Sequence, residues 1–400
     1  MKTDRRTLLK SALGGMTAAS YSRILGANDR VGMALIGSGR RGREVMKAFL
    51  DTGRAELKVI CDIYDVQRER GRQMLASTSG DKPFECSTHE FAFARGGVDA
   101  VLIGAPDHWH LDLATAAFQA GKHVYLEKPA THHFDEGPKL LRAARMSGKV
   151  CTVGTQQRSG AHYKQAREEF FTNPNSKLGK VLFVRTYWSN FPWQARTIQP
   201  QAKPAGLDWL RFLGRTPYYE YNHARYDSWR YFPEYGGGVL ADILNHWADV
   251  AVWMMDDQPV DCVASGGIFH AHDGRVNPDT VNAILRFKKG WNLTFESSVH
   301  SLRDDRPGLT FMGTEGSLEI TRADYVFRPN KGEPVTVKAS GSLEIAHASD
   351  FLDAIRSGRK PSADVDLALQ GVLPCHMARA AYWTGKRVQY DAGRNEIVTI

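Results

Sequence analysis

The chain has little cysteine, and no two of its cysteines lie close together in the sequence. The five cysteines stand at positions 61, 86, 151, 262 and 375, an odd number at wide spacing. This pattern excludes a disulfide framework and the paired spacing of a structural zinc site. Cys61 and Cys151 lie within apolar runs, which favours buried thiols.

Long apolar runs and a strong charge imbalance are also missing. No stretch is long and apolar enough to cross a bilayer, so we do not expect an integral membrane protein. The formal net charge is only +8, and half of it falls within the first 27 residues. The remainder is too weak and scattered to indicate a nucleic acid partner. With 42% hydrophobic residues, the 400-residue chain has the composition of a globular protein of two or three domains.

The basic start of the chain has the pattern of a targeting segment. Arg5 and Arg6 precede a weakly apolar region, Ser11–Ala19, that small residues follow. This predicts a twin-arginine export signal over residues 1–28, and hence a periplasmic or exported protein. Lys10 argues against a membrane anchor, and cleavage is expected between residues 18 and 28. The alternative is a basic, disordered N-terminus.

The stretch 31–62 carries the strongest motif. An apolar run, Val31–Ile36, leads into a glycine-rich turn, which a helical segment and a second apolar run, Leu57–Ile60, follow. Asp62 comes 20 residues after the last glycine of the turn. Strand, turn, helix, strand and acid in this order predict a dinucleotide site, although a glycine-rich surface turn of another α/β protein is the alternative. The turn consists of Gly37, Ser38, Gly39, Arg40, Arg41 and Gly42.

Each part of this motif has a physical task. The first glycine permits the turn, the second lets a pyrophosphate approach the backbone, and the third allows close packing of helix on strand. We expect Asp62 to accept hydrogen bonds from the adenosine ribose, which favours NAD because a 2′-phosphate would meet a carboxylate. Arg40 and Arg41 leave NADP possible.

The order of predicted elements indicates two domains. Strands alternate with helices from residue 29 to 155, which predicts a doubly wound parallel sheet in an α/β domain. Over residues 156–385 the pattern changes to strands with short turns, at 260–269, 280–288, 291–300, 308–313 and 317–320, which predicts an antiparallel sheet. A proline-bearing loop is expected over 192–217, and a C-terminal tail over 386–400.

Polar residues follow two strands of the first domain. Since ligands bind at the carboxyl ends of parallel strands, these side chains should face the same crevice as the glycine turn. Lys128 precedes a proline, which favours extended backbone, so its ammonium can point at a substrate oxygen; a solvated surface lysine is the alternative. The residues concerned are Asp107, His108 and His110 after one strand, and Glu127 and Lys128 after the next.

A second cluster follows the glycines at 236–238. A continuous helix is predicted over Val239–Met254, with Asp242 and His246 four residues apart on one face. Asp242 could orient His246, and His246 could act as a general base near neutral pH. The alternative interpretation of these two residues alone is an Asp–His pair that is satisfied by partners in the core.

Together the motifs resemble the Gfo/Idh/MocA family of oxidoreductases. The resemblance rests on Gly37–Gly42, on Glu127-Lys128-Pro129 and on Asp242-x-x-x-His246. It implies an N-terminal Rossmann domain, a C-terminal α/β domain with a large open sheet, and a dimer or tetramer. It also implies catalytic roles for Lys128, Asp242 and His246. Gln156 and Arg158 resemble the family's domain junction, beside the nicotinamide and the substrate.

The predicted function is an NAD(P)-dependent hydride transfer at a secondary alcohol of a sugar or polyol. An exported enzyme of this kind must retain its cofactor and recycle it in place. The alternative function that meets this condition is an NAD-dependent glycosidase, which oxidises a glycoside transiently, eliminates the aglycone and reduces the sugar again. A metal hydrolase built on His108 and His110 would leave the glycine turn unexplained, and a non-catalytic sugar-binding module would not need Lys128, Asp242 and His246 together. Trp188 and Arg230 are candidate substrate contacts. They belong to an aromatic-rich region that suits stacking on sugar rings, or alternatively fills the core or an oligomer interface. The residues of this region are Trp188, Trp193, Tyr218, Tyr219, Tyr226, Trp229, Arg230 and Tyr235.

Overall fold

The computed structural model describes residues 30–75, 82–189, 199–300 and 307–400. The predicted export signal lies outside these residues. Within the described chain no helix is long and apolar enough to cross a membrane. All five cysteines are buried free thiols, as Cys61 and Cys151 were expected to be.

The first sheet is parallel throughout. Within the described residues it has six strands in the order β3-β2-β1-β4-β5-β6, so the order reverses between β1 and β4. That reversal opens a crevice at the carboxyl ends of these two strands. The predicted doubly wound α/β fold is therefore confirmed. The strands are β1 (Val31–Ile36), β2 (Ala55–Cys61), β3 (Phe84–Cys86), β4 (Ala100–Ile103), β5 (His123–Leu126) and β6 (Cys151–Val153).

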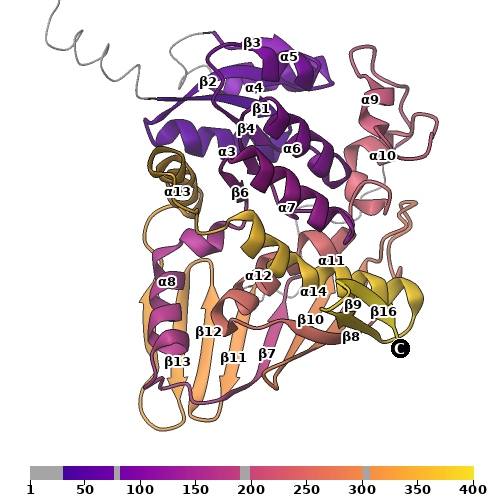
Figure 1. Ribbon diagram of the computed structural model, residues 1–400. Coiled ribbons are helices and arrows are strands. Elements are labelled where there is room, and N and C mark those ends of the chain that lie inside the picture. Colours follow the sequence, from indigo (N-terminus) through magenta and orange to yellow (C-terminus); the bar gives the residue numbers. More distant parts are fainter. Residues whose placement is uncertain (1–29, 76–81, 190–198, 301–306) are drawn as a thin grey trace, which may run out of the picture.

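Helices connect these strands, and one helix from the end of the chain joins them. Phe351 of α13 (Leu343–Ser357) packs edge-on against Phe49 and Tyr125, so α13 covers part of the first domain (Figure 1). Ser342 caps this helix by accepting a hydrogen bond from the backbone of Ile345. The connecting elements are α3 (Arg40–Asp51), α4 (Asp65–Leu75), α5 (His89–Ala94), η1 (Asp107–Trp109), α6 (His110–Gln119), α7 (Glu136–Ser147) and η2 (Gln156–Ser159).

The second sheet is large and mostly antiparallel, as the sequence predicts. In the described chain it has ten strands in the order β14-β13-β12-β11-β7-β10-β9-β8-β15-β16, with β7 and β10 as its parallel pair. Residues 386–400, expected as a tail, form the hairpin β15–β16 and extend this sheet. The strands are β7 (Val181–Tyr187), β8 (Pro259–Gly267), β9 (Thr280–Phe287), β10 (Asn292–Ser298), β11 (Gly308–Gly313), β12 (Gly316–Thr321), β13 (Asp324–Pro329), β14 (Val335–Lys338), β15 (Val388–Asp391) and β16 (Glu396–Thr399).

One face of this sheet packs under helices. Strand β9 alternates buried and exposed residues along its length, because only one of its faces meets the core. Helices α12 and α14 lie between the two sheets (Figure 1) and contribute apolar residues to one continuous core. The remaining helices are α8 (Ala161–Arg167), η3 (Glu168–Thr172), α9 (Trp209–Leu213), α10 (His223–Asp227), η4 (Trp229–Tyr231), α11 (Gly238–Asp242), α12 (Leu244–Met255) and α14 (Val365–Thr384).

The single helix predicted over residues 239–254 is wrong, because α11 and α12 are separate and break at Ile243. The backbone N–H of His246 bonds to the carbonyl oxygen of Ile243, and Lys128 takes the carbonyl oxygen of Asp242 instead. A lysine from the first domain thus replaces one bond of the helix. The loop expected over 192–217 lies partly outside the described residues, and its described part contains α9.

A buried ion pair joins η2 to α12 at the domain junction. Nε and Nη2 of Arg158 donate to the carboxylate of Asp249 at 2.8 and 2.9 Å, and both side chains are only 1% exposed. Trp253 lies 5.5 Å from the guanidinium, measured to the centre of one ring. Such a pair has a high cost if one partner is removed, because the other charge stays buried.

We expect Arg158→Met to lower the free energy of unfolding by about 3–5 kcal/mol, since it leaves Asp249 as an unpaired buried charge. The double variant Arg158→Met, Asp249→Leu should recover most of that loss. Urea unfolding of the parent, both single variants and the double variant measures the coupling. Losses that simply add in the double variant would contradict this account of the pair.

Candidate active site

The glycine turn between β1 and α3 has the geometry that its sequence predicts. Gly37 has φ +85°, and a Cβ there would lie 2.8 Å from the backbone of Gly104 and Ala105. A Cβ on Gly42 would lie 2.2 Å from the carbonyl oxygen of Gly37, so this glycine permits close packing. No heavy atom lies within 4 Å of the Cβ position of Gly39, and no side chain caps α3. An anion can therefore approach the N–H groups at the start of α3, and these residues fit a pyrophosphate.

Asp62 follows β2 and closes the other side of the turn. Its carboxylate accepts hydrogen bonds from the backbone of Ser38 at 2.7 Å and of Tyr64 at 2.9 Å. Burial raises the pKa of Asp62 to about 6, although both backbone bonds oppose the shift. The group is mainly ionised at pH 7, so it can accept from a ribose hydroxyl and disfavours a 2′-phosphate.

The polar side chains of the turn point elsewhere. The hydroxyl of Ser38 is buried against Gly71, and its backbone N–H is bound to Asp62, so neither group is available to a ligand. Arg40 is exposed beside Glu44, and the Nε of Arg41 donates to Glu127 at 3.2 Å. The expected phosphate contact therefore comes from the backbone of the turn rather than from the guanidinium of Arg41.

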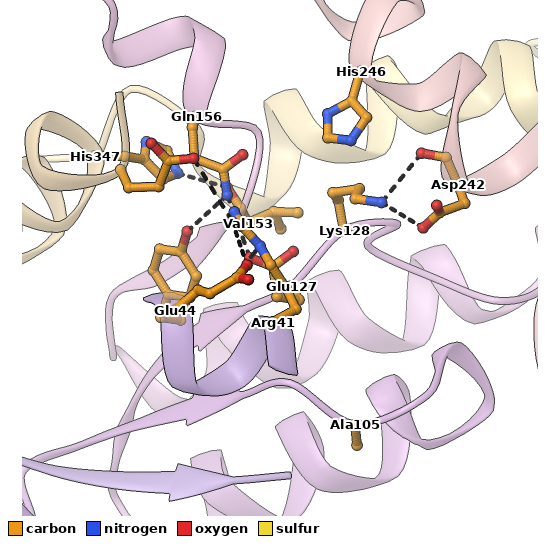
Figure 2. A network of polar contacts seen from close by, with 12 residues as sticks. Arg41, Glu44, Ala105, Glu127, Lys128, Val153, Gln156, Asp242, His246 and His347 are labelled. Carbon is orange, nitrogen blue, oxygen red and sulfur yellow. Dashed lines mark hydrogen bonds and ion pairs between the residues drawn. The ribbon is translucent and has the colours of Figure 1, made fainter. Parts of the chain in front are cut away.

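Glu127 belongs to a compact polar network (Figure 2). Besides Arg41, it accepts a hydrogen bond from the amide of Gln156 at 3.3 Å, and the same amide nitrogen lies 3.3 Å from the hydroxyl of Tyr125. Burial and the neighbouring carboxylate of Glu127 raise the pKa of Tyr125 above its usual range. These contacts fix Glu127 directly before Lys128, at the carboxyl end of β5.

Lys128 crosses the domain junction to Asp242 on α11 (Figure 2). Its Nζ lies 2.5 Å from the Oδ1 and 3.2 Å from the backbone carbonyl oxygen of Asp242. The two side chains are 9% and 8% exposed, and Arg230 approaches the same carboxylate at 3.4 Å. Burial alone would raise the pKa of Asp242, but the two cations outweigh it and lower this pKa to about 2.

His246 stands beside this pair on α12 and takes its partner from the large sheet. The Nη2 of Arg322, which follows β12, lies 3.3 Å from the Nδ1 of His246. The ring of Trp188 lies 5.5 Å from the imidazole ring, centre to centre. Burial, Lys128 and Arg322 together lower the pKa of His246 well below its ordinary value, so the ring is neutral at pH 7.

Asp242 does not orient His246, contrary to the prediction. The carboxylate of Asp242 binds Lys128 and Arg230, and Arg322 binds the imidazole. The break at Ile243 separates the two residues onto different helices. Sequence reasoning missed Arg322 because it lies 76 residues beyond His246 in a strand-end turn without a motif.

The ring nitrogens of the two histidines after β4 lie against backbone carbonyl oxygens, and a contact of these residues with the cofactor stays a prediction. The ring nitrogens of His108 lie 2.8 and 3.4 Å from the carbonyl oxygens of Phe212 and Tyr235. Those of His110 lie 2.7 and 3.1 Å from the carbonyl oxygens of Pro129 and Ala105.

Two other predicted residues also lie away from their expected contacts. Asp107 is buried toward Asp242 rather than toward the turn; burial, with the carboxylate of Asp242, raises its pKa to about 7. Arg158, expected to bind substrate, is bound by Asp249 in the buried pair described above.

Two candidate substrate contacts do border the site. Trp188 packs on His246, and the guanidinium of Arg322 lies over the ring of Trp188, 5.2 Å from its centre. Arg230 is 32% exposed, stacks on Trp229 at 4.1 Å and contacts Asp242. The side chains of Trp188 and Arg230 form a wall of the site on the side of the second domain. Trp193 lies outside the described residues.

A cavity of about 610 Å³ lies away from this site, between α6, α7 and residues 215–234, and is lined by His108, His132 and Arg215 among others. It does not include Lys128, Asp242 or His246. Among the described residues no group of three or more His, Cys, Asp and Glu side chains could hold a metal ion.

Comparisons with known proteins agree with this arrangement. A model of the oxidoreductase family with an NAD-binding Rossmann fold matches residues 31–155, and the model of the GFO/IDH/MocA C-terminal domain matches residues 211–319. The chain is 27% identical over 306 residues to 1,5-anhydro-D-fructose reductase of Ensifer adhaerens, covering 74% of this chain and 81% of that one. It is 25% identical to myo-inositol 2-dehydrogenase of Thermotoga maritima over 90% of this chain and 98% of the relative.

A solved structure has the same fold. Levoglucosan dehydrogenase in complex with NADH and levoglucosan superposes with a TM-score of 0.72 at 20% identity, covering 90% of this chain and 99% of that one. The chain therefore belongs to the Gfo/Idh/MocA family of oxidoreductases, and its first domain is the family's NAD-binding Rossmann domain.

Proposed function

We propose that the protein transfers a hydride between NAD and a secondary alcohol of a sugar or polyol. The observation that carries this proposal is the Lys128–Asp242 pair beside a neutral His246, at the carboxyl edge of the Rossmann sheet. The names of the relatives, an anhydrofructose reductase and an inositol dehydrogenase, support a polyhydroxylated substrate.

The residues divide the work at one substrate oxygen. Bound nicotinamide supplies the hydride acceptor or donor. Lys128 donates a hydrogen bond to the reacting oxygen and stabilises its negative charge, while Asp242 holds the ammonium group in position. His246, neutral because of its lowered pKa, accepts the hydroxyl proton during oxidation and returns it during reduction.

Arg322 controls which nitrogen of His246 carries hydrogen. A guanidinium can only donate, so Nδ1 accepts from Arg322 and the neutral ring holds its hydrogen on Nε2. In that tautomer His246 and Lys128 both donate to one oxygen, which suits a bound carbonyl. Accepting a hydroxyl proton at Nε2 requires Arg322 to release Nδ1. Arg322 is exposed, so its guanidinium is accessible to a substrate.

We infer export and in-place recycling from the sequence of residues 1–28. Free nicotinamide cofactor is not expected outside the cytoplasm, so one substrate would reduce the cofactor and a second would reoxidise it. The alternative is a glycosidase that oxidises, eliminates and re-reduces. The intact Lys128–Asp242 pair supports the first. A screen of aldoses, polyols and glycosides separates them, since only the glycosidase releases an aglycone.

We also propose a homo-oligomer formed through the outer face of the large sheet. Apolar side chains are exposed there on several strands, and an apolar surface of this kind is typical of an interface. Light scattering of the purified protein measures the oligomeric state. The exposed residues are Leu182, Val263, Ile284, Met312 and Val335.

The cofactor prediction concerns Asp62. Asp62→Asn keeps the shape of the side chain but removes its charge, so the preference for NAD over NADP should fall at least about tenfold. Titration of the cofactor-free protein with both dinucleotides measures this ratio, and Glu56→Gln on β2, the strand that precedes Asp62, is the control. An unchanged ratio would mean that Asp62 does not contact the ribose.

The catalytic prediction concerns His246 and Lys128. His246→Ala and Lys128→Ala should each lower kcat at least about a hundredfold, because a general base and an oxyanion donor each contribute on the order of 10² or more. The double variant should lose less than the product of the two single losses, since both groups act on one oxygen. Steady-state kinetics of the three variants, with melting temperature and NAD affinity, measures this.

The pH profile provides a further check on the same assignment. Because the pKa of His246 is lowered, the neutral base persists below pH 6.5, and the oxidation rate should not fall there in the parent protein. A near-normal kcat in His246→Ala, or a collapse of its melting temperature that accounts for the lost activity, would overturn the catalytic role.

The export prediction concerns the paired arginines. Arg5→Lys together with Arg6→Lys should keep the protein in the cytoplasm, because the export receptor reads the two guanidinium groups. Cell fractionation and immunoblotting of the parent and the double variant measure this. Unchanged export of the variant would refute the twin-arginine assignment.

A further inference from the structure

One segment of the second domain leaves its own sheet and attaches to the first domain. We call residues 199–235, which contain α9, α10 and η4, the clasp. Figure 1 shows α9 and α10 standing beside the Rossmann sheet rather than over the large sheet. The clasp ends directly before the glycines that lead into α11 and Asp242, so it links the two halves of the site.

The first attachment is at the carboxyl end of β2. Leu207 forms an antiparallel bridge with Tyr64. The carbonyl oxygen of Gly206 accepts from Asp65 at 3.3 Å, and the backbone N–H of Asp208 donates to Ile63 at 3.1 Å. The clasp is therefore fixed to the loop that immediately follows Asp62.

The second attachment is after β4. The carbonyl oxygen of Phe212 contacts both the indole N–H of Trp109, at 3.0 Å, and the ring of His108, at 2.8 Å. Ion pairs reinforce it on the outside, from Arg211 to Glu90 at 3.2 Å and from Arg215 to Asp112 at 2.8 Å. The loops after β2 and β4 flank the crevice of a Rossmann sheet, and the clasp ties both.

The clasp is stiffened from within by aromatic packing. Trp209 stacks on Phe212 at 4.9 Å, and Arg225 lies 3.7 Å from the ring centre of Tyr219. Such packing makes the clasp a rigid wall rather than a loose loop. The buried members of this cluster are Trp209, Phe212, Leu213, Tyr231, Phe232 and Tyr235.

Tyr226 is the clasp residue that packs on the loop after Asp62. Its ring meets that of Tyr64 edge-on, with 6.0 Å between centres. Burial and the carboxylate of Asp62 raise the pKa of the Tyr226 hydroxyl, which places this hydroxyl in the electrostatic range of the ribose-binding acid. Both observations put Tyr226 at the adenosine end of the crevice.

We propose that the clasp closes the adenosine end of the dinucleotide site through Tyr226 and makes cofactor release slow. The inference rests on the proposed NAD-dependent function and adds to it the element that retains the cofactor. Release requires the dinucleotide to leave past a wall held at both β2 and β4. An enzyme that recycles its cofactor in place needs such a device.

The experiment measures release of NADH rather than turnover. Full-length purified protein is loaded with NADH and mixed with excess NAD, and the loss of the fluorescence of bound NADH gives the release rate. Tyr226→Ala should accelerate release at least about tenfold, because it removes an aromatic wall of the site. Tyr226→Phe, which keeps the ring, should release at the rate of the parent protein.

Tyr218→Ala is the matched control, since Tyr218 lies on the clasp but is 69% exposed. Its release rate should not change. Far-ultraviolet circular dichroism checks folding, and Tyr226→Leu replaces Tyr226→Ala if the alanine variant does not fold. A folded Tyr226→Ala or Tyr226→Leu protein that releases NADH at the parent rate overturns the clasp proposal. A parent protein that binds no NADH overturns the proposed function, and the clasp proposal with it.

Discussion

The ion pair between Lys128 and Asp242 is the contact on which the site depends. It joins the end of β5 in the first domain to the end of α11 in the second, with 2.5 Å between Nζ and Oδ1. Removing two charges from water is costly, and Arg230 adds a second cation that offsets the burial of the carboxylate. The lowered pKa of Asp242, about 2, means that this carboxylate stays charged at any physiological pH.

The same lysine also shapes the helix that carries His246. The Nζ of Lys128 donates a hydrogen bond to the carbonyl oxygen of Asp242 and so replaces the backbone N–H that would bond to it in a continuous helix. The next helix, α12, begins after Ile243. His246 then bonds Arg322 from the large sheet instead of Asp242. Three elements distant in sequence, β5, α12 and the turn after β12, thus bring Lys128, His246 and Arg322 close to one another. The clasp adds a fourth, since it ends where α11 begins.

The sequence predicted the features that depend on residues close together in the chain, namely the glycine turn and the order of strands and helices. The glycine turn was predictable because φ +85° at Gly37 and the close approach at Gly42 admit no other residue type. The alternation of strands and helices gave the parallel sheet, and the family resemblance gave Lys128, Asp242 and His246 as a set. Partners across the domain junction were not predictable: Arg158 is bound to Asp249 and Arg322 to His246 over 91 and 76 residues of sequence. His108 and His110 looked like ligands in the sequence, but their ring nitrogens are occupied by backbone carbonyls that only the folded chain brings close.

The central claim is that this site transfers hydride to a dinucleotide that the protein itself holds. The most direct test adds sugars and polyols to the purified protein, loaded with NAD and freed of excess, and follows the absorbance of reduced nicotinamide. The account predicts a rise that stops at one reduced cofactor per bound dinucleotide with at least one polyhydroxylated substrate, and whose rate falls at least about a hundredfold in His246→Ala. No rise with any sugar or polyol in a protein that demonstrably contains NAD, or an undiminished rate of the rise in His246→Ala, would contradict it.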